Sequence, residues 1–223
     1  MADARVDEMM TGMREYLREF APTDMRLLLW ALRQLAHGKP LTQDQVNQRI
    51  AALGPAPAEA RRALRELTER DARDQIVGAM GLSLNDHPHQ ITVNGVTLSA
   101  WCAMDTLFLP ILLRQELTIT SPSPVTGAAI QLRVSPERVE EVNPTSTVVS
   151  HVILDPRRAN LTSVEAVLSA FCDHIHFFSA RDEAERWASG REQITILTVE
   201  EGFALEQGIW EALLPDLLDH EQV

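Results

Sequence analysis

The hydrophobic pattern of the chain changes its period near Glu69, and this change limits the folds that the sequence can adopt. Before Glu69, apolar residues recur at helical spacing, whereas after it short apolar runs alternate with turn residues, which indicates strands. The predicted helices cover Ala4–Phe20, a stretch from Thr23 to Leu35 that ends at Gly38, Thr42–Leu53 and Pro57–Leu67. The sequence therefore predicts an α+β fold whose helices come first.

A hairpin is predicted directly after these helices. Strands are expected over Gln75–Leu84 and Gln90–Leu98, and the second stretch contains Asn94-Gly95, a pair that accepts the positive φ angles of a type I′ turn. Several helices followed by a hairpin form a winged-helix pattern. We therefore expect a helical, winged-helix-like region at residues 1–80 and a second domain at residues 81–223 that packs on it, because no long linker separates them.

From Ser99 onward, helices and strands are mixed. Ser99–Leu113 is predicted to be helical with an interruption at Pro110, and Ser179 is expected to cap a later helix. Further strands are expected at Leu117–Thr120, Ala128–Val134, Thr147–Leu154, Phe171–Phe178 and Ile194–Val199, and further helices at Ser163–Ala170, Asp182–Ser189 and Glu200–Leu218.

The charge distribution argues against a nucleic-acid or membrane partner. The net charge is −12, and all of it falls in residues 81–223 because residues 1–80 carry equal numbers of acidic and basic side chains. Binding to phosphates needs a basic surface, so DNA binding by the winged-helix-like region gains no support. No apolar run reaches the ~20 residues of a membrane helix, and no secretory signal is visible, so we expect a cytoplasmic protein.

The first candidate for chemistry is Cys102 with Asp105. On a helix these two residues share a face, and Cys102 would lie in the first turn after Ser99, where backbone N–H groups lower a thiol pKa. A carboxylate beside a thiol can accept its proton and pass it on. The alternative is a buried cysteine next to a capping or surface aspartate.

The second candidate is the segment around Cys172. On a strand, Cys172, His174 and His176 point to one face and offer sulfur and nitrogen ligands that suit zinc or copper. The alternative is that both histidines are hydrogen-bonded core residues. His87 and His89 lie in a predicted turn and are expected to be solvated. Two cysteines in all exclude a disulfide scaffold.

Taken together, the two cysteine segments resemble alkylmercury (organomercurial) lyases, bacterial enzymes that split carbon–mercury bonds. The resemblance rests on SAWCAMDTLFLP at 99–110 and FCDHIHFF at 171–178, with weaker support from Thr126-Gly127, Val134-Ser135-Pro136 and ERWAS at 185–189. It implies a winged-helix-like helical region packed on a mixed α/β domain with antiparallel sheets.

The same resemblance implies a catalytic trio of Cys102, Asp105 and Cys172, which would also hold the Hg(II) product. The sequence departs from the family pattern at Asp173, where a second cysteine often stands, and at Ser123 and Pro124, where some members carry another. None of these positions belongs to the trio. The implied partners are an organomercury substrate and small thiols or a mercuric reductase that remove mercury, with no organic cofactor and no resident metal.

Thiolates are the softest protein ligands and Hg(II) is a very soft cation, so the residues suit this chemistry. Aromatic residues around the motifs would form a pocket for the organic group, namely Trp101, Phe108, Phe177 and Phe178. Three alternatives remain open at this point. They are a non-catalytic soft-metal binder or sensor that uses Cys102, Cys172, His174 and His176, a winged-helix regulator with a ligand-sensing second domain, and a structural interaction module.

Overall fold

The computed structural model describes residues 4–20, 22–52, 62–153, 159 and 161–215, and in this part of the chain the strands form two antiparallel sheets. The larger sheet has the order β1-β2-β3-β5-β4-β6-β7-β8, and the smaller sheet has the order β10-β9-β11. The strands are β1 (Thr68–Arg70), β2 (Ile76–Ala79), β3 (Leu82–Ser83), β4 (His89–Val93), β5 (Val96–Ala100), β6 (Leu117–Pro122), β7 (Ala129–Val134), β8 (Val139–Asn143), β9 (Val148–Val152), β10 (Phe177–Phe178) and β11 (Ile194–Thr198).

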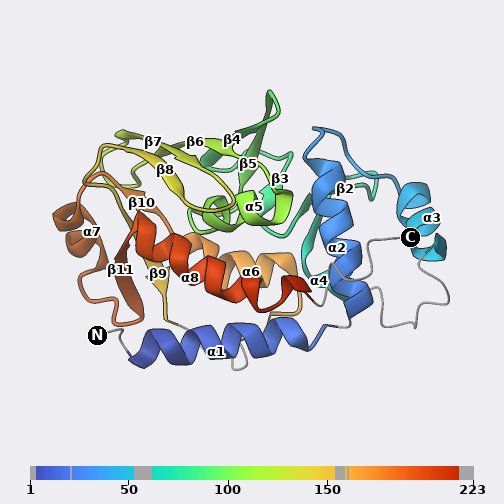
Figure 1. Cartoon of the computed structure of the whole chain (residues 1–223), viewed down its shortest axis with the longest axis horizontal. Coiled ribbons are helices and arrows are strands. Elements are labelled where there is room, and N and C mark those ends of the chain that lie inside the picture. The colour runs from blue at the N-terminus through green and yellow to red at the C-terminus, as the bar shows by residue number, and fades with distance from the viewer. Residues whose placement is uncertain (1–3, 21, 53–61, 154–158, 160, 216–223) are drawn as a thin grey trace.

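Helices cover these sheets, and α8 crosses the centre of the view between α5 and α1 (Figure 1). The helix α8 also packs against strands β8, β9 and β11, so it joins both sheets to the N-terminal helix. The helices are α1 (Ala4–Arg18), α2 (Pro22–Leu35), α3 (Gln43–Ala52), α4 (Arg62–Glu66), α5 (Asp105–Leu113), α6 (Val164–Ala170), α7 (Arg181–Ala188) and α8 (Val199–Glu211), with a short 3-10 turn, η3 (Cys172–His174). No helix in the described part is long and apolar enough to cross a membrane.

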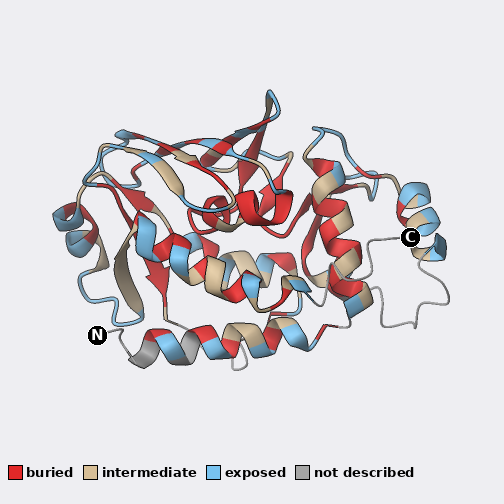
Figure 2. Cartoon of the chain, in the orientation of Figure 1, coloured by how far each residue is buried: buried red, intermediate tan, exposed pale blue. Residues whose placement is uncertain are grey.

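The N-terminal helices follow the periodicity of the sequence. On α2 the apolar residues at helical spacing are fully buried, and Figure 2 shows this buried stripe along the helix. They are Leu27, Leu28, Ala31, Leu32 and Leu35. The predicted fourth helix is present at Arg62–Glu66, and residues 57–61 of that prediction lie outside the described part.

The larger sheet runs across the predicted domain boundary. Strands β1 and β2 precede residue 80 and β3 follows it, yet all three are neighbours in one sheet. The predicted hairpin of β4 and β5 is confirmed, because Val93 pairs with Val96 around Asn94 and Gly95, which both have positive φ. The single strand predicted over Gln75–Leu84 is wrong, since the chain turns at Met80-Gly81 and β2 pairs with β3.

Three other predicted elements differ from the structure. Ser99–Leu113 is not one helix, because Ser99 pairs with both neighbouring strands, β5 continues to Ala100, and α5 begins only at Asp105. Phe171–Phe178 is not one strand, since it contains η3 and only its last two residues form β10. The last predicted helix is interrupted, because α8 ends at Glu211 and a turn follows at residues 212–213, and residues 216–218 of that prediction lie outside the described part.

Two smaller differences concern a cap and an edge strand. The N-cap of α7 is Ala180, and Ser179 instead donates its hydroxyl to the Glu183 carboxylate at 2.6 Å. Strand β8 was not predicted, because Glu140 and Glu141 interrupt the apolar alternation of this edge strand. Ser163 does cap α6 and accepts the N–H of Ala166, as a serine at that position should.

Candidate active site

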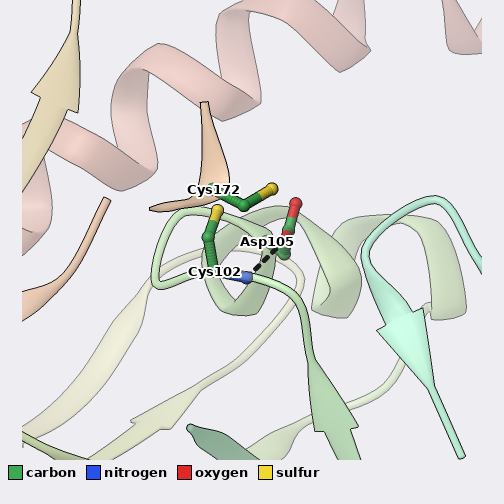
Figure 3. A group of neighbouring side chains, drawn as sticks. All are labelled: Cys102, Asp105 and Cys172. Atoms are coloured by element: carbon green, nitrogen blue, oxygen red, sulfur yellow. Dashed lines mark hydrogen bonds between the residues drawn. The ribbon is translucent and has the colours of Figure 1, made fainter. Parts of the chain in front are cut away.

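Cys102, Asp105 and Cys172 converge in the folded chain and are called here the thiol–carboxyl cluster. One ligand atom from each residue, two Sγ atoms and a carboxylate oxygen, lies within 4.8 Å of the others. Figure 3 shows the three side chains directed toward a common point. All three residues are buried, and both cysteines are free thiols. The structure thus brings together the three residues that the sequence nominated as the site, in a form that suits a soft metal.

The turn between β5 and α5 positions the first two members of the cluster. The Asp105 Oδ2 atom accepts the backbone N–H of Cys102 at 2.7 Å, which folds residues 101–104 into a tight turn (Figure 3). The backbone N–H of Ala103 donates to the Ile175 carbonyl at 3.3 Å. This bond ties the Cys102 turn to the segment that carries Cys172.

Gly81 lies directly against the Asp105 carboxyl. A Cβ atom at this position would lie 2.6 Å from Asp105 Cγ, and the φ angle of Gly81 is +86°. Both the space and the backbone conformation therefore require glycine here. Because the Trp101 N–H also donates to the Gly81 carbonyl at 2.8 Å, the β2–β3 turn fixes one side of the cluster.

Burial dominates the electrostatics of the cluster. It raises the pKa of Asp105 to about 6, against the opposing hydrogen bonds from Cys102. Burial, together with the neighbouring Cys172 and Asp105, raises the pKa of the Cys102 thiol well above its usual value. For Cys172 the neighbouring Cys102 thiol favours the thiolate, but burial and the charge of Asp105 outweigh it, and the net pKa is raised.

The expectation that Cys102 has a lowered pKa in a helical first turn is therefore wrong. The helix begins at Asp105, and the Cys102 N–H is already bound to the Asp105 carboxylate. No free helix terminus stabilises the thiolate, and the low polarity of the surroundings favours the neutral thiol.

A cavity of about 150 Å³ adjoins the cluster, and Cys102, Asp105 and Cys172 form part of its wall. Most of the other lining residues are apolar, and α1, α5, α6 and α8 each contribute to them. Trp101 and Phe108 line it as predicted, whereas Phe177 and Phe178 do not and are buried elsewhere. An apolar cavity of this volume is large enough to hold one benzene ring.

The histidines near Cys172 do not share its face. Since η3 replaces the predicted strand, the alternation that would align Cys172, His174 and His176 is absent. The His176 Nε2 atom binds the Asp173 carbonyl at 3.1 Å, and its ring packs edge-on against Trp187. Asp173 is exposed, and its charge contributes to the raised pKa of the Cys172 thiol. Within the described residues, the potential metal-ligand group that contains the cysteines includes neither histidine.

The two histidines expected to be solvated are instead structural. His89 is buried and its Nδ1 binds the Ser121 hydroxyl at 2.8 Å. His87 is half-buried and its Nε2 binds the Glu69 carboxylate at 3.0 Å. Glu69 also accepts hydrogen bonds from Ser83 and Asn85, so this carboxylate links β1 to β3 and to the loop that follows β3.

Two polar residues of the cavity wall were missed by sequence reasoning, Glu206 on α8 and His151 on β9. Glu206 had a visible signal, because it lies three residues from both Phe203 and Ile209 on the apolar stripe of its helix. His151 had less signal, because it lies within the fully buried strand Val148–Val152.

The comparisons with known proteins agree with this geometry. The sequence model of the alkylmercury lyase family matches residues 82–211. The chain is 33% identical to an alkylmercury lyase of Streptomyces lividans over 95% of both chains, and 36% identical to one of Pseudomonas putida over 85% of both. Its fold is similar to a solved structure described as the mercury-bound form of MerB2, with a TM-score of 0.70 and 25% identity, covering 93% of this chain and 99% of that one.

Two buried thiols and a carboxyl at the wall of an apolar cavity define a protein that handles a soft metal carrying an organic group. The comparisons with known proteins identify the family within this class. The chain belongs to the alkylmercury lyase family, and it is an organomercurial lyase, an enzyme that cleaves carbon–mercury bonds.

Proposed function

We propose that Cys102, Cys172 and Asp105 carry out the cleavage, with the cysteines as mercury ligands and Asp105 as the proton carrier. The observation that carries this proposal is the approach of their ligand atoms to within 4.8 Å at the wall of the cavity. Two thiolates are the minimum that holds Hg(II) in linear coordination. The third group is a carboxylate, which serves proton transfer better than soft-metal binding.

The reaction begins with ligand exchange on mercury. The thiol of one cysteine replaces the small-molecule thiolate that is bound to mercury in the substrate. The displaced thiolate takes up the cysteine proton and leaves as a free thiol, and a Cys–S–Hg–R adduct remains. Asp105, ionised at neutral pH with a pKa of about 6, then takes the proton of the other cysteine thiol. The second thiolate binds mercury and raises the electron density on the carbon–mercury bond.

The carbon–mercury bond is cleaved when the proton that Asp105 has taken from the thiol is transferred to carbon. Asp105 delivers it to the carbon atom, the electron pair of the C–Hg bond becomes the new C–H bond, and the hydrocarbon R–H leaves. Hg(II) remains on Cys102 and Cys172, with Asp105 or water as a further ligand. Burial assists each step, because the raised pKa values of the thiols keep their protons in the site until mercury displaces them.

These reaction steps need no organic cofactor and no resident metal, since the proton and both mercury ligands come from side chains of the protein. Small thiols remove the mercury by exchange, or a mercuric reductase accepts it. We place the enzyme in the cytoplasm, with no nucleic-acid or membrane partner, and treat residues 1–80 as a winged-helix-like region that covers the catalytic domain at residues 81–223. The covering role of this region is supported by the packing of α1 on α8 and by Tyr16, which lines the cavity.

A single turnover without added thiol tests the proposal by counting thiols. Each chain has two free cysteines, and both should be titratable with a thiol reagent in the unfolded protein before the reaction. After one equivalent of phenylmercury, we expect one equivalent of benzene, one equivalent of bound Hg(II) and no titratable thiol. Benzene release that leaves one thiol titratable would contradict the assignment of both cysteines as mercury ligands.

A further inference from the structure

The cavity wall contains two polar residues that the cleavage mechanism does not use, Glu206 and His151. Both are buried. Within the described part of the chain, neither belongs to the thiol–carboxyl cluster, whose ligand atoms lie within 4.8 Å of one another. When the cluster holds mercury, the organic group of the substrate must occupy the rest of the same cavity. Glu206 and His151 are therefore placed to meet the organic group rather than the metal.

Glu206 is a neutral carboxylic acid at neutral pH. Burial, reinforced by the charge of Asp105, raises its pKa to about 8, and the Trp210 indole offsets only part of this shift. The cavity lining contains no lysine or arginine that could pair with a carboxylate. The polar neighbour of the Glu206 carboxyl is the Trp210 indole on the same helix, although the buried Trp210 Nε1 atom makes no hydrogen bond of standard geometry within the described part. The acid therefore offers both an O–H donor and a carbonyl acceptor to a ligand.

His151 supplies a second acceptor. Its Nδ1 lies 2.9 Å from the Val152 carbonyl, and a carbonyl can only accept, so Nδ1 carries the hydrogen. Burial lowers the pKa of the His151 imidazole, which keeps the ring neutral. The Nε2 atom is then an unprotonated acceptor on a residue of the cavity wall. Tyr16, another polar residue of the wall, already donates its hydroxyl to the Leu161 carbonyl at 3.4 Å.

We propose that Glu206 and His151 recognise organomercurials whose organic group carries an amino or hydroxyl substituent. Such a substituent donates to His151 Nε2 or to the Glu206 carbonyl and accepts the Glu206 O–H. An anionic substituent is disfavoured, because the cavity is mostly apolar and no lysine or arginine side chain lines it. The inference rests on the proposed function, since it assumes that mercury occupies the thiol–carboxyl cluster.

The test compares kcat/KM for phenylmercury, 4-aminophenylmercury and 4-carboxyphenylmercury by quantifying benzene, aniline and benzoate. In the unaltered enzyme, aminophenylmercury should exceed phenylmercury by about 10-fold, the scale of one buried hydrogen bond, with the gain in KM. Carboxyphenylmercury should be the poorest of the three substrates. Because an amino group also makes the ring carbon more basic, the decisive quantity is the change of the aminophenyl-to-phenyl ratio on substitution of Glu206.

Glu206→Leu should lower that ratio by about 10-fold, whereas Glu206→Gln, which keeps a donor and an acceptor, should preserve most of it. Glu211→Leu, an exposed glutamate on the same helix, is the matched control and should leave the ratio unchanged. An unchanged ratio in Glu206→Leu overturns the proposal.

If Glu206→Leu does not fold, Glu206→Met and His151→Leu take its place with the same criterion. Equal turnover of carboxyphenylmercury and aminophenylmercury by the unaltered enzyme also overturns the proposal without any variant. A different failure, in which the unaltered enzyme releases no arene from any of the three compounds, would instead refute the proposed function.

Discussion

Cys102→Ser and Cys172→Ser are each expected to reduce hydrocarbon release from phenylmercury by about 10³-fold or more, the scale seen when a reacting side chain is removed. Serine has nearly the shape of cysteine, so the buried site should stay folded. Its oxygen is a hard ligand with little affinity for mercury, so one of the two mercury ligands is lost. With a single thiolate, mercury binds but the carbon–mercury bond is not activated.

The cysteine variants also separate binding from cleavage. Each single variant retains one thiol and should still bind one equivalent of phenylmercury, with the carbon–mercury bond intact. The measurement is benzene by gas chromatography together with protein-bound mercury, and thermal unfolding controls for the fold. A variant that releases benzene at the rate of the unaltered enzyme would remove that cysteine from the mechanism.

Asp105→Asn is expected to lower turnover by about 10²- to 10⁴-fold, the usual contribution of a positioned acid–base group. The amide can still accept the Cys102 N–H, so the turn that shapes the cluster should persist. It cannot take a proton from the second thiol and cannot deliver one to carbon. Phenylmercury should therefore bind to this variant without cleavage.

The same substitution should increase the stability of the protein at neutral pH. The folded-state pKa of Asp105 is raised from 3.8 to about 6, so the folded state loses stability as the pH rises through this interval and the group ionises. Asparagine does not ionise and so avoids the free-energy cost of burying the Asp105 charge. A rise of the pKa from 3.8 to about 6 corresponds to at most about 3 kcal/mol. The difference in the free energy of unfolding should grow between about pH 4 and 6 and stay constant above that, in denaturant titrations. A variant that is less stable than the unaltered enzyme at pH 8 would show that Asp105 is not under this strain.

The convergence of Cys102, Asp105 and Cys172 could be predicted because the two sequence motifs that carry them are specific and lie on segments that the fold brings together. Their local structure was not predictable from periodicity. Ser99 pairs with strands on both sides, and this tertiary pairing overrides the helical spacing of residues 99–113. In the same way, η3 replaces a strand whose alternation looked regular. Both errors mattered. The predicted helix at residues 99–113 produced the expected low pKa of the Cys102 thiol, and the predicted strand at residues 171–178 produced the alignment of Cys172 with His174 and His176.

The helices and the hairpin were easier to predict, since local signals and tertiary packing agree there. The apolar stripe of α2 and the Asn94-Gly95 turn each specify their own conformation. Gly81 is the opposite case. Its role depends on the Asp105 carboxyl, which comes into contact only after β2, β3 and α5 have assembled. No pattern within the sequence around Gly81 contains that information.

Proton delivery from Asp105 is tested by the release of benzene from phenylmercury in D₂O, with excess thiol and purified protein of known metal content. We expect monodeuterated benzene, because the proton that Asp105 delivers comes from a thiol that exchanges with solvent, and we expect the release to vanish in Asp105→Ala. Binding of mercury without benzene, or undiminished release by Asp105→Ala, would contradict cleavage by proton delivery from the thiol–carboxyl cluster.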